Sequence, residues 1–221
     1  MISGGGARSR PGQGLLKDGA YEAIKELIQA QVFKPGTFLS ERELAARLGM
    51  SKTPVRSALE RLQAEGFVRI SPQQGAVVRE QARDEIMEMF DVRVALEPYV
   101  LRRLEDSLGR WQLGRLRENL QQQVWAVEAP DVGRYSQLDA DFHLLFCQFL
   151  GNQEIERVLR GLRDRLHRTV LRVLAANVGR LEASYGEHAG IVEALEEGDL
   201  ELAVRRLLEH LEQARRLALG P

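Results

Sequence analysis

The chain has 221 residues, one cysteine and a formal net charge of −1. Its 31 basic and 32 acidic residues exclude a uniformly cationic nucleic-acid binder, so that any DNA contact must come from a local patch. The single cysteine excludes an internal disulfide framework. No apolar run reaches the length of a membrane span, and the N-terminus lacks the apolar core of a secretory signal. We therefore expect a cytoplasmic protein without a membrane partner.

The N-terminal part of the chain is predicted to be a tail followed by the first helices of a small domain. Residues 1–14 are rich in Gly, Ser and Pro and have no apolar period, so we predict a disordered tail there. Apolar residues at helical spacing predict a first helix over 17–33. A second helix opens at Ser40, which is expected to form a capping box with Glu43, and closes at Gly49.

The next segment completes a pattern that is typical of DNA-binding domains. A third helix is predicted to begin at Ser51 or Thr53, either of which can cap it. Two short strands, 67–71 and 76–79, follow around a turn. Helix, helix, short turn, helix and hairpin, in that order, predict a winged helix-turn-helix over 15–80.

The remainder of the chain, 84–219, is predicted to be helical throughout. Caps and breaks divide it into six amphipathic segments, and Ser184 with Glu187 indicates a capping box at the start of the fifth. The fold class is therefore mainly α, with an N-terminal winged helix-turn-helix plus a C-terminal all-α helical bundle. The predicted helices lie at about 84–105, 110–128, 131–150, 153–177, 184–197 and 199–219.

Basic and polar side chains gather at the start of the third predicted helix. In a helix-turn-helix, the first turn of the second helix reaches base edges in the major groove. Lys52 and Arg56 can donate to guanine or phosphate, whereas Thr53 offers a hydroxyl and a methyl group. Each of them alone is equally typical of an exposed helix start, but their joint placement before a wing favours DNA contact. The expected DNA-contacting residues are Arg42, Lys52, Thr53, Arg56, Gln74 and Gly75.

The segment LSERELAARLGMSKTPVRSALERLQAEGFVRISPQQGAVV resembles the DNA-binding domain of the GntR family of bacterial transcription regulators. The resemblance covers about 17–80 and includes the S-x-T-P-V-R run and the G-F-V-x-x-x-P-x-x-G wing. It implies contacts with double-stranded DNA from Arg42, Lys52, Thr53, Arg56 and Gly75. Many members carry arginine where this chain has lysine at the second of these positions, and lysine lacks the planar fork.

A second constellation lies in the predicted bundle. Asp139 and His143 are four residues apart, on one helix face. His188 lies 10 residues before the turn at 198–199 and His210 lies 11 residues after it, so that each sits roughly 15–16 Å from the turn in an antiparallel hairpin. One carboxylate and three imidazoles fit a first-row divalent metal, although a single histidine in a bundle is more often structural.

Residues 84–219 resemble the FCD ligand-binding domain of the FadR subfamily through VRVALEPYV, LDADFHLLFCQFLGN and EHAGIVEALEEGDLELAVRRLLEHL. The resemblance implies that Asp139, His143, His188 and His210 hold a divalent metal ion, with zinc as the first expectation and nickel, manganese or iron as alternatives. It also implies a small organic acid effector beside the metal, close to the arginine of VRVALEPYV.

That arginine, Arg93, is also read as an ordinary salt-bridging residue on a helix. Cys147 lies one turn beyond His143 and is predicted to pack as a small buried thiol rather than to ligate. His167 lies on an arginine-rich helix face and is predicted at the cavity edge or the surface.

The leading hypothesis is a transcription regulator that binds a short inverted repeat as a homodimer and whose helical domain senses a metabolite. One alternative is a metal-dependent hydrolase, which lacks support from any nucleophile or general-base motif. A second is a metal sensor in which the ion itself is the signal. A third is a metal-free domain for larger acyl ligands, which the complete ligand set disfavours.

Overall fold

A computed structural model describes residues 11–72, 75–105, 107–177 and 179–220. The chain divides into two compact units, with the boundary between Glu80 and Gln81. Each unit has its own buried apolar clusters. The two units are described separately below.

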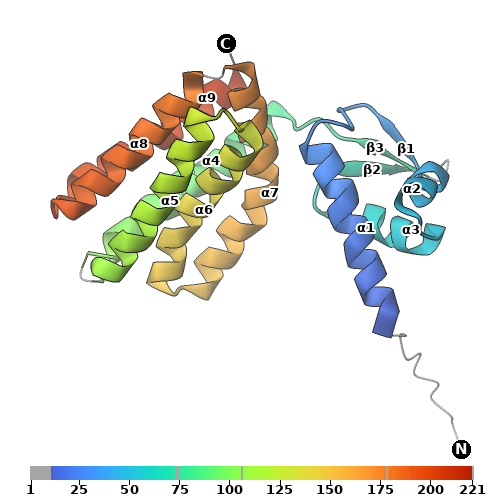
Figure 1. Cartoon of the computed structure of the whole chain (residues 1–221), viewed down its shortest axis with the longest axis horizontal. Helices are drawn as coiled ribbons and strands as arrows, with labels where there is room; N and C mark the ends of the chain where they lie inside the picture. Colours follow the sequence, from blue (N-terminus) through green and yellow to red (C-terminus); the bar gives the residue numbers. More distant parts are fainter. Residues whose placement is uncertain (1–10, 73–74, 106, 178, 221) are drawn as a thin grey trace, which may run out of the picture. The chain divides into compact units, whose positions relative to one another are not determined.

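The first unit contains helices α1 (Pro11–Gln29), α2 (Glu41–Leu48) and α3 (Lys52–Ala64) and a small antiparallel sheet (Figure 1). The strands β1 (Phe38–Ser40), β2 (Val68–Ser71) and β3 (Gly75–Val78) form this sheet in the order β1-β3-β2. Apolar side chains of α1, α2, α3 and the strands share one core. The winged helix-turn-helix predicted from the sequence is confirmed.

Local sequence accounts for the turn between α2 and α3. Ser40 precedes α2 and its hydroxyl accepts the amide of Glu43 at 3.5 Å. Gly49 ends α2 in the left-handed region, at φ 62°, which glycine adopts without steric cost. Ser51 holds the capping position of α3 but its side chain makes no capping hydrogen bond.

Two details of the N-terminal prediction are wrong. Helix α1 begins at Pro11, inside the segment 1–14 that was expected to be a disordered tail, while residues 1–10 lie outside the described part. Proline is tolerated there because the first turn of a helix needs no amide donor. Strand β1 was not predicted, because its three residues become a strand only by pairing with β3 at Leu39 and Ala76.

The second unit is a bundle in which six helices of the described chain pack together (Figure 1). They are α4 (Arg83–Arg103), α5 (Arg110–Glu128), α6 (Val132–Leu150), α7 (Gln153–Ala176), α8 (Gly179–Glu196) and α9 (Leu200–Leu219). The central core comes from α4, α6, α8 and α9 with parts of α5 and α7. The predicted all-α bundle is confirmed, and no described helix is long and apolar enough to cross a membrane.

The predicted start of the fifth bundle helix is wrong. Helix α8 begins at Gly179, so that Ser184 lies inside it and is buried. The partner that the capping box requires is used elsewhere, because both oxygens of Glu187 bond to Arg180. The Ser-x-x-Glu pattern therefore does not mark a helix start here, because its glutamate forms an ion pair with Arg180 instead.

Candidate metal centre and nucleic-acid interface

Three helices of the bundle bring the predicted ligands together. Asp139 and His143 lie on α6, His188 on α8 and His210 on α9, and all four side chains are buried. One potential ligand atom of each lies within 4.8 Å of those of the other three. The antiparallel α8–α9 hairpin places His188 and His210 side by side, as their equal distance from the turn predicts.

The spacing of these atoms suits a metal ion. Nε2 of His210 lies 3.2 Å from Nε2 of His143 and 3.3 Å from Nε2 of His188. Oδ1 of Asp139 lies 3.6 Å from Nε2 of His188. Neighbouring donor atoms around one ion with bonds of about 2.0–2.2 Å stand roughly 3.0–3.6 Å apart, so these three separations are those of donors that converge on one ion.

A chain of hydrogen bonds defines the tautomer of His188. The carbonyl oxygen of Leu138 can only accept, so the amide nitrogen of Asn119 donates to it at 3.1 Å. Asn119 Oδ1 then accepts from Gln123 Nε2 at 2.6 Å, which leaves Gln123 Oε1 facing His188 Nδ1 at 2.9 Å. Because an amide oxygen only accepts, Nδ1 carries the proton and Nε2 directs a lone pair at the other ligands.

A carboxylate lies behind the Nδ1 atom of each of the other two imidazoles, hydrogen-bonded to His210 and at ion-pair distance from His143. Oε2 of Glu97 lies 2.7 Å from His143 Nδ1, and Oε2 of Glu187 lies 2.7 Å from His210 Nδ1. Burial by itself raises the pKa of Glu97, but Arg93 and His143 outweigh it and hold that pKa well below its usual range. Burial also opposes ionisation of Glu187, whereas hydrogen bonds from His210 and an arginine lower its pKa to about 2. Both groups are thus ionised acceptors, and both Nδ1 atoms carry protons.

Three imidazole lone pairs and one carboxylate therefore face a common centre. Burial lowers the pKa of His143, His188 and His210, which favours the neutral form that ligates metals. Burial raises the pKa of Asp139, an effect that His210 opposes. A cation at its centre would stabilise this electron-rich arrangement, and imidazole and carboxylate are donor types that first-row divalent metals take.

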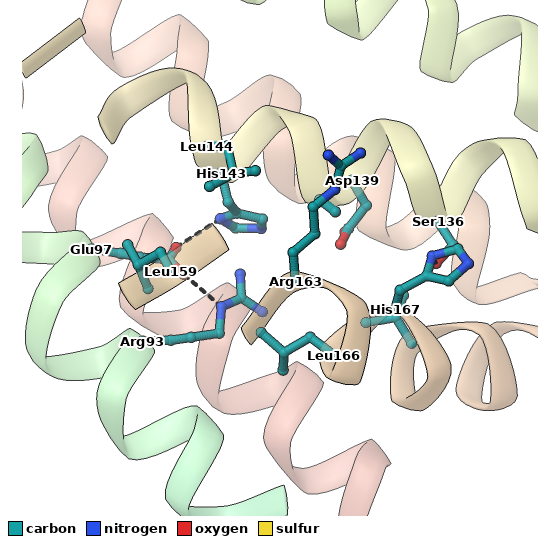
Figure 2. A pocket seen from close by; sticks show the side chains of 12 residues that line it. Arg93, Glu97, Ser136, Asp139, His143, Leu144, Leu159, Arg163, Leu166 and His167 are labelled. Atoms are coloured by element: carbon teal, nitrogen blue, oxygen red, sulfur yellow. Dashed lines mark hydrogen bonds and ion pairs between the residues drawn. The ribbon is translucent and has the colours of Figure 1, made fainter. Parts of the chain in front are cut away.

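A cavity adjoins this cluster on the side of α4, α6 and α7 (Figure 2). Arg93 is buried and its Nε donates to Glu97 Oε1 at 2.5 Å. Both interpretations of this arginine therefore hold, because it lines the cavity and also forms an ion pair within its helix. His167 lines the same cavity with its Nδ1 2.8 Å from Ser136 Oγ. The lining combines basic, polar and apolar side chains, among them Arg93, Ser136, Asp139, His143, Arg163 and His167.

Cys147 stays outside the ligand cluster. Its thiol is buried and lies 3.8 Å from the backbone oxygen of His143. Burial raises the pKa of Cys147 to about 12, so the group is a thiol rather than a ligating thiolate.

The outer partners Glu97, Gln123 and Glu187 were not predicted from the sequence. Glu97 lies one helical turn after Arg93, and Glu187 directly precedes His188. Their positions next to these two site residues were the only hints in the sequence that Glu97 and Glu187 belong to the site. Gln123 offered a weaker one, since it is a polar residue on the buried face of α5 with no exposed surface.

On the first unit, most of the expected DNA-contacting side chains lie on the surface. Arg42 on α2 and Lys52 and Thr53 on α3 are exposed. Arg56 on α3 is also exposed, and it forms an ion pair with Glu41 across the helix-turn-helix. Gln74 lies outside the described residues.

Gly75 has a structural reason for being glycine. It is buried at the start of β3 and pairs with Ser40 of β1. A Cβ at this position would stand 2.4 Å from the carbonyl oxygen of Leu39 and 2.7 Å from the ring of Phe38. Its predicted contact with DNA stays a prediction.

Both units match known families. Residues 16–78 match the family of bacterial regulatory proteins named gntR, and residues 88–213 match the FCD domain. The HTH-type transcriptional repressor RspR of Escherichia coli (strain K12) is 29% identical over 193 residues, which cover 87% of this chain and 84% of that protein. An uncharacterized HTH-type regulator of Streptomyces ambofaciens is 30% identical over 191 residues, which cover 86% of this chain and 80% of that protein.

Solved structures share the fold over nearly the whole chain. A putative GntR regulator from Rhodococcus sp. RHA1 has a TM-score of 0.80 at 22% identity and covers 92% of this chain and 97% of its own. E. coli McbR/YncC has a TM-score of 0.75 at 24% identity, and the match covers 90% of this chain and 94% of that one. With both of its units matched, the chain belongs to the GntR family of DNA-binding transcription regulators that carry a C-terminal FCD domain.

Proposed function

We propose that this regulator holds one divalent metal ion in its FCD domain and uses it to bind a small organic acid that controls operator binding. The observation that carries the proposal is the convergence of three imidazoles and one carboxylate, with an oxygen within 3 Å of the Nδ1 atom of each imidazole. Such outer partners are a regular feature of metal-binding histidines. Zinc is the first expectation for this donor set, with nickel, manganese or iron as alternatives.

The adjoining cavity suits an anionic effector. Arg93 and Arg163 line it beside Asp139 and His143. Both arginines are already paired, Arg93 with Glu97 and Arg163 with Asp141 at 2.7 Å, so they offer oriented positive charge at the cavity wall. A bound metal supplies a Lewis-acidic position for a carboxylate oxygen. The apolar side chains of Leu144, Leu159 and Leu166 limit the effector to a small acid with a short carbon skeleton.

Metal counting tests the site directly. Purified wild type, incubated with each candidate ion and desalted, is expected to carry one ion per chain by mass spectrometry, and His188→Ala close to none. The melting temperature of the metal-loaded wild type is then followed with a panel of small mono- and dicarboxylic acids, and at least one should raise it while His188→Ala does not respond. Wild-type protein that retains none of the ions would show that the four residues are ordinary buried side chains.

For the DNA-binding unit, we propose a homodimer that binds a short inverted repeat. One recognition helix offers few base contacts, so two copies related by a two-fold axis gain specificity. A regulator of this kind acts where the DNA is, in the cytoplasm. The relative RspR is named a repressor, and we propose the same sign of regulation here. Light scattering is expected to give twice the chain mass of 24.9 kDa; a monomer at micromolar concentration would contradict the dimer.

A further inference from the structure

One guanidinium of the recognition helix is held in a defined orientation. Arg56 Nε donates to Glu41 Oε1 at 3.0 Å and Arg56 Nη2 donates to Glu41 Oε2 at 2.9 Å. The carboxylate side chain of Glu41 is only 8% exposed, whereas the side chain of Arg56 is 56% exposed. A buried carboxylate on α2 thus accepts two hydrogen bonds from an exposed arginine on α3.

The geometry leaves one edge of the guanidinium available. Glu41 occupies the side edge, made of Nε and one N–H of Nη2. The end edge, made of Nη1 and the second N–H of Nη2, has no partner among the described residues. Two parallel donors of this kind match the O6 and N7 acceptors of guanine in the major groove.

The ion pair is better suited to orientation than to stability. A pair whose arginine is exposed contributes little to the free energy of unfolding, because solvent screens the guanidinium and its long side chain loses rotamer freedom. The same loss of freedom is useful in recognition, because an arginine that is already ordered has less entropy to lose on binding. Glu41 itself is anchored as the first residue of α2, where the helix dipole favours a negative charge.

We propose that Glu41 is a positioning residue for DNA recognition, which aims the free edge of Arg56 at one guanine in each operator half-site. The inference rests on the proposed DNA interface of α3. It assigns sequence reading to Arg56, whereas Lys52, an exposed residue one turn earlier, acts as a point charge.

The test uses the intact chain and an operator obtained by selection from random duplexes. Each guanine is replaced in turn by 7-deazaguanine, which lacks the N7 acceptor, and binding is measured by fluorescence anisotropy. For wild type, one guanine per half-site should show about a tenfold loss of affinity. Arg56→Lys keeps the positive charge but lacks the two parallel donors of the guanidinium. For this variant, 7-deazaguanine at that position should leave the affinity about unchanged.

Variants of the acid separate positioning from charge. Glu41→Gln should reduce the loss at that guanine to about threefold and leave affinity for random duplexes within about twofold. Glu41→Asp keeps the charge but withdraws the carboxylate by one methylene, and should behave similarly. Glu43→Gln, an exposed residue on the same helix with the same charge change, is the matched control and should keep the tenfold loss.

The outcomes are distinct. A wild-type guanine penalty that survives in Glu41→Gln and Glu41→Asp, or in Arg56→Lys, overturns the inference. So does a uniform loss of affinity for all duplexes in the Glu41 variants, which indicates a purely structural role. If Glu41→Gln does not fold by circular dichroism, Glu41→Asp decides, because it keeps the negative charge at the start of α2 and changes only the reach of the carboxylate. Failure to select any duplex would instead refute the proposed DNA interface itself.

Discussion

His188 has no exposed surface, and its ring is oriented by an amide relay that ends at a backbone carbonyl. Replacing Gln123 by leucine removes the acceptor for Nδ1 and lets the imidazole adopt the other tautomer, with a proton on Nε2. We expect Gln123→Leu to bind metal about 10–100-fold more weakly, the usual cost of losing such a partner. Competition with a chromogenic chelator measures this change.

Gln121→Leu is the matched control, since it makes the same change at an exposed position on α5. It should leave metal affinity unchanged. Equal affinities in Gln123→Leu and wild type would mean that the relay does not define the tautomer.

At this scale the sequence predicted which four side chains converge but not what surrounds them. Asp139 and His143 share a helix face, and His188 and His210 lie at nearly equal distances from one turn. The spacing along the chain was therefore enough to predict that each pair lies together. The approach of Gln123 to His188 depends on how α5 packs against α8, which no spacing in the sequence encodes. Glu187 was assigned to a local capping box because the competing partners, Arg180 and His210, are visible only in three dimensions.

Strand β1 makes the wing a three-stranded element rather than a hairpin, and its closeness to β3 depends on Gly75. Gly75→Ala would force a Cβ against the carbonyl of Leu39 at 2.4 Å, so the strands must separate. We expect the first unit to lose about 1–3 kcal/mol of stability, as in other overpacked sites. Thermal melting followed by circular dichroism measures it.

Gly19→Ala serves as the comparison within the same unit. Its Cβ would meet only Met50, at an ordinary 3.7 Å, and alanine favours the helical conformation of α1. This variant should melt at the wild-type temperature or slightly above. A Gly75→Ala protein as stable as Gly19→Ala would refute the steric argument.

Elements with their own hydrophobic period were predicted to within a few residues, as α2 and the bundle helices other than α8 show. Two features that depend on distant partners, strand β1 and the start of α8, were missed or misplaced. Strand β1 has three residues and exists through its pairing with β3. The start of α8 was misplaced because Ser184 satisfies a local rule while its burial belongs to the bundle.

On the scale of the whole molecule, the two units have separate buried clusters, whereas all four proposed ligands lie in the second unit. We expect calorimetry of the intact chain to show two transitions. A chelator should lower the transition of the second unit by at least about 5 °C, because a ligand that binds only the folded state stabilises it.

The assignment of the transitions follows from the variants. Gly75→Ala should shift only the chelator-insensitive transition, and His188→Ala should abolish the chelator effect on the other. A chelator that lowers both transitions equally would show that the units unfold together and would contradict their independence.

The cavity that adjoins the ligand cluster also has a consequence for time. It is lined by Asp139 and His143, so it gives a bound ion a route to solvent, and the proposed organic acid would occupy the same space. The ion would then exchange more slowly while the acid is bound than while the cavity is empty. Each of the two would prolong the stay of the other, and the regulator would keep its metal best when its effector is abundant.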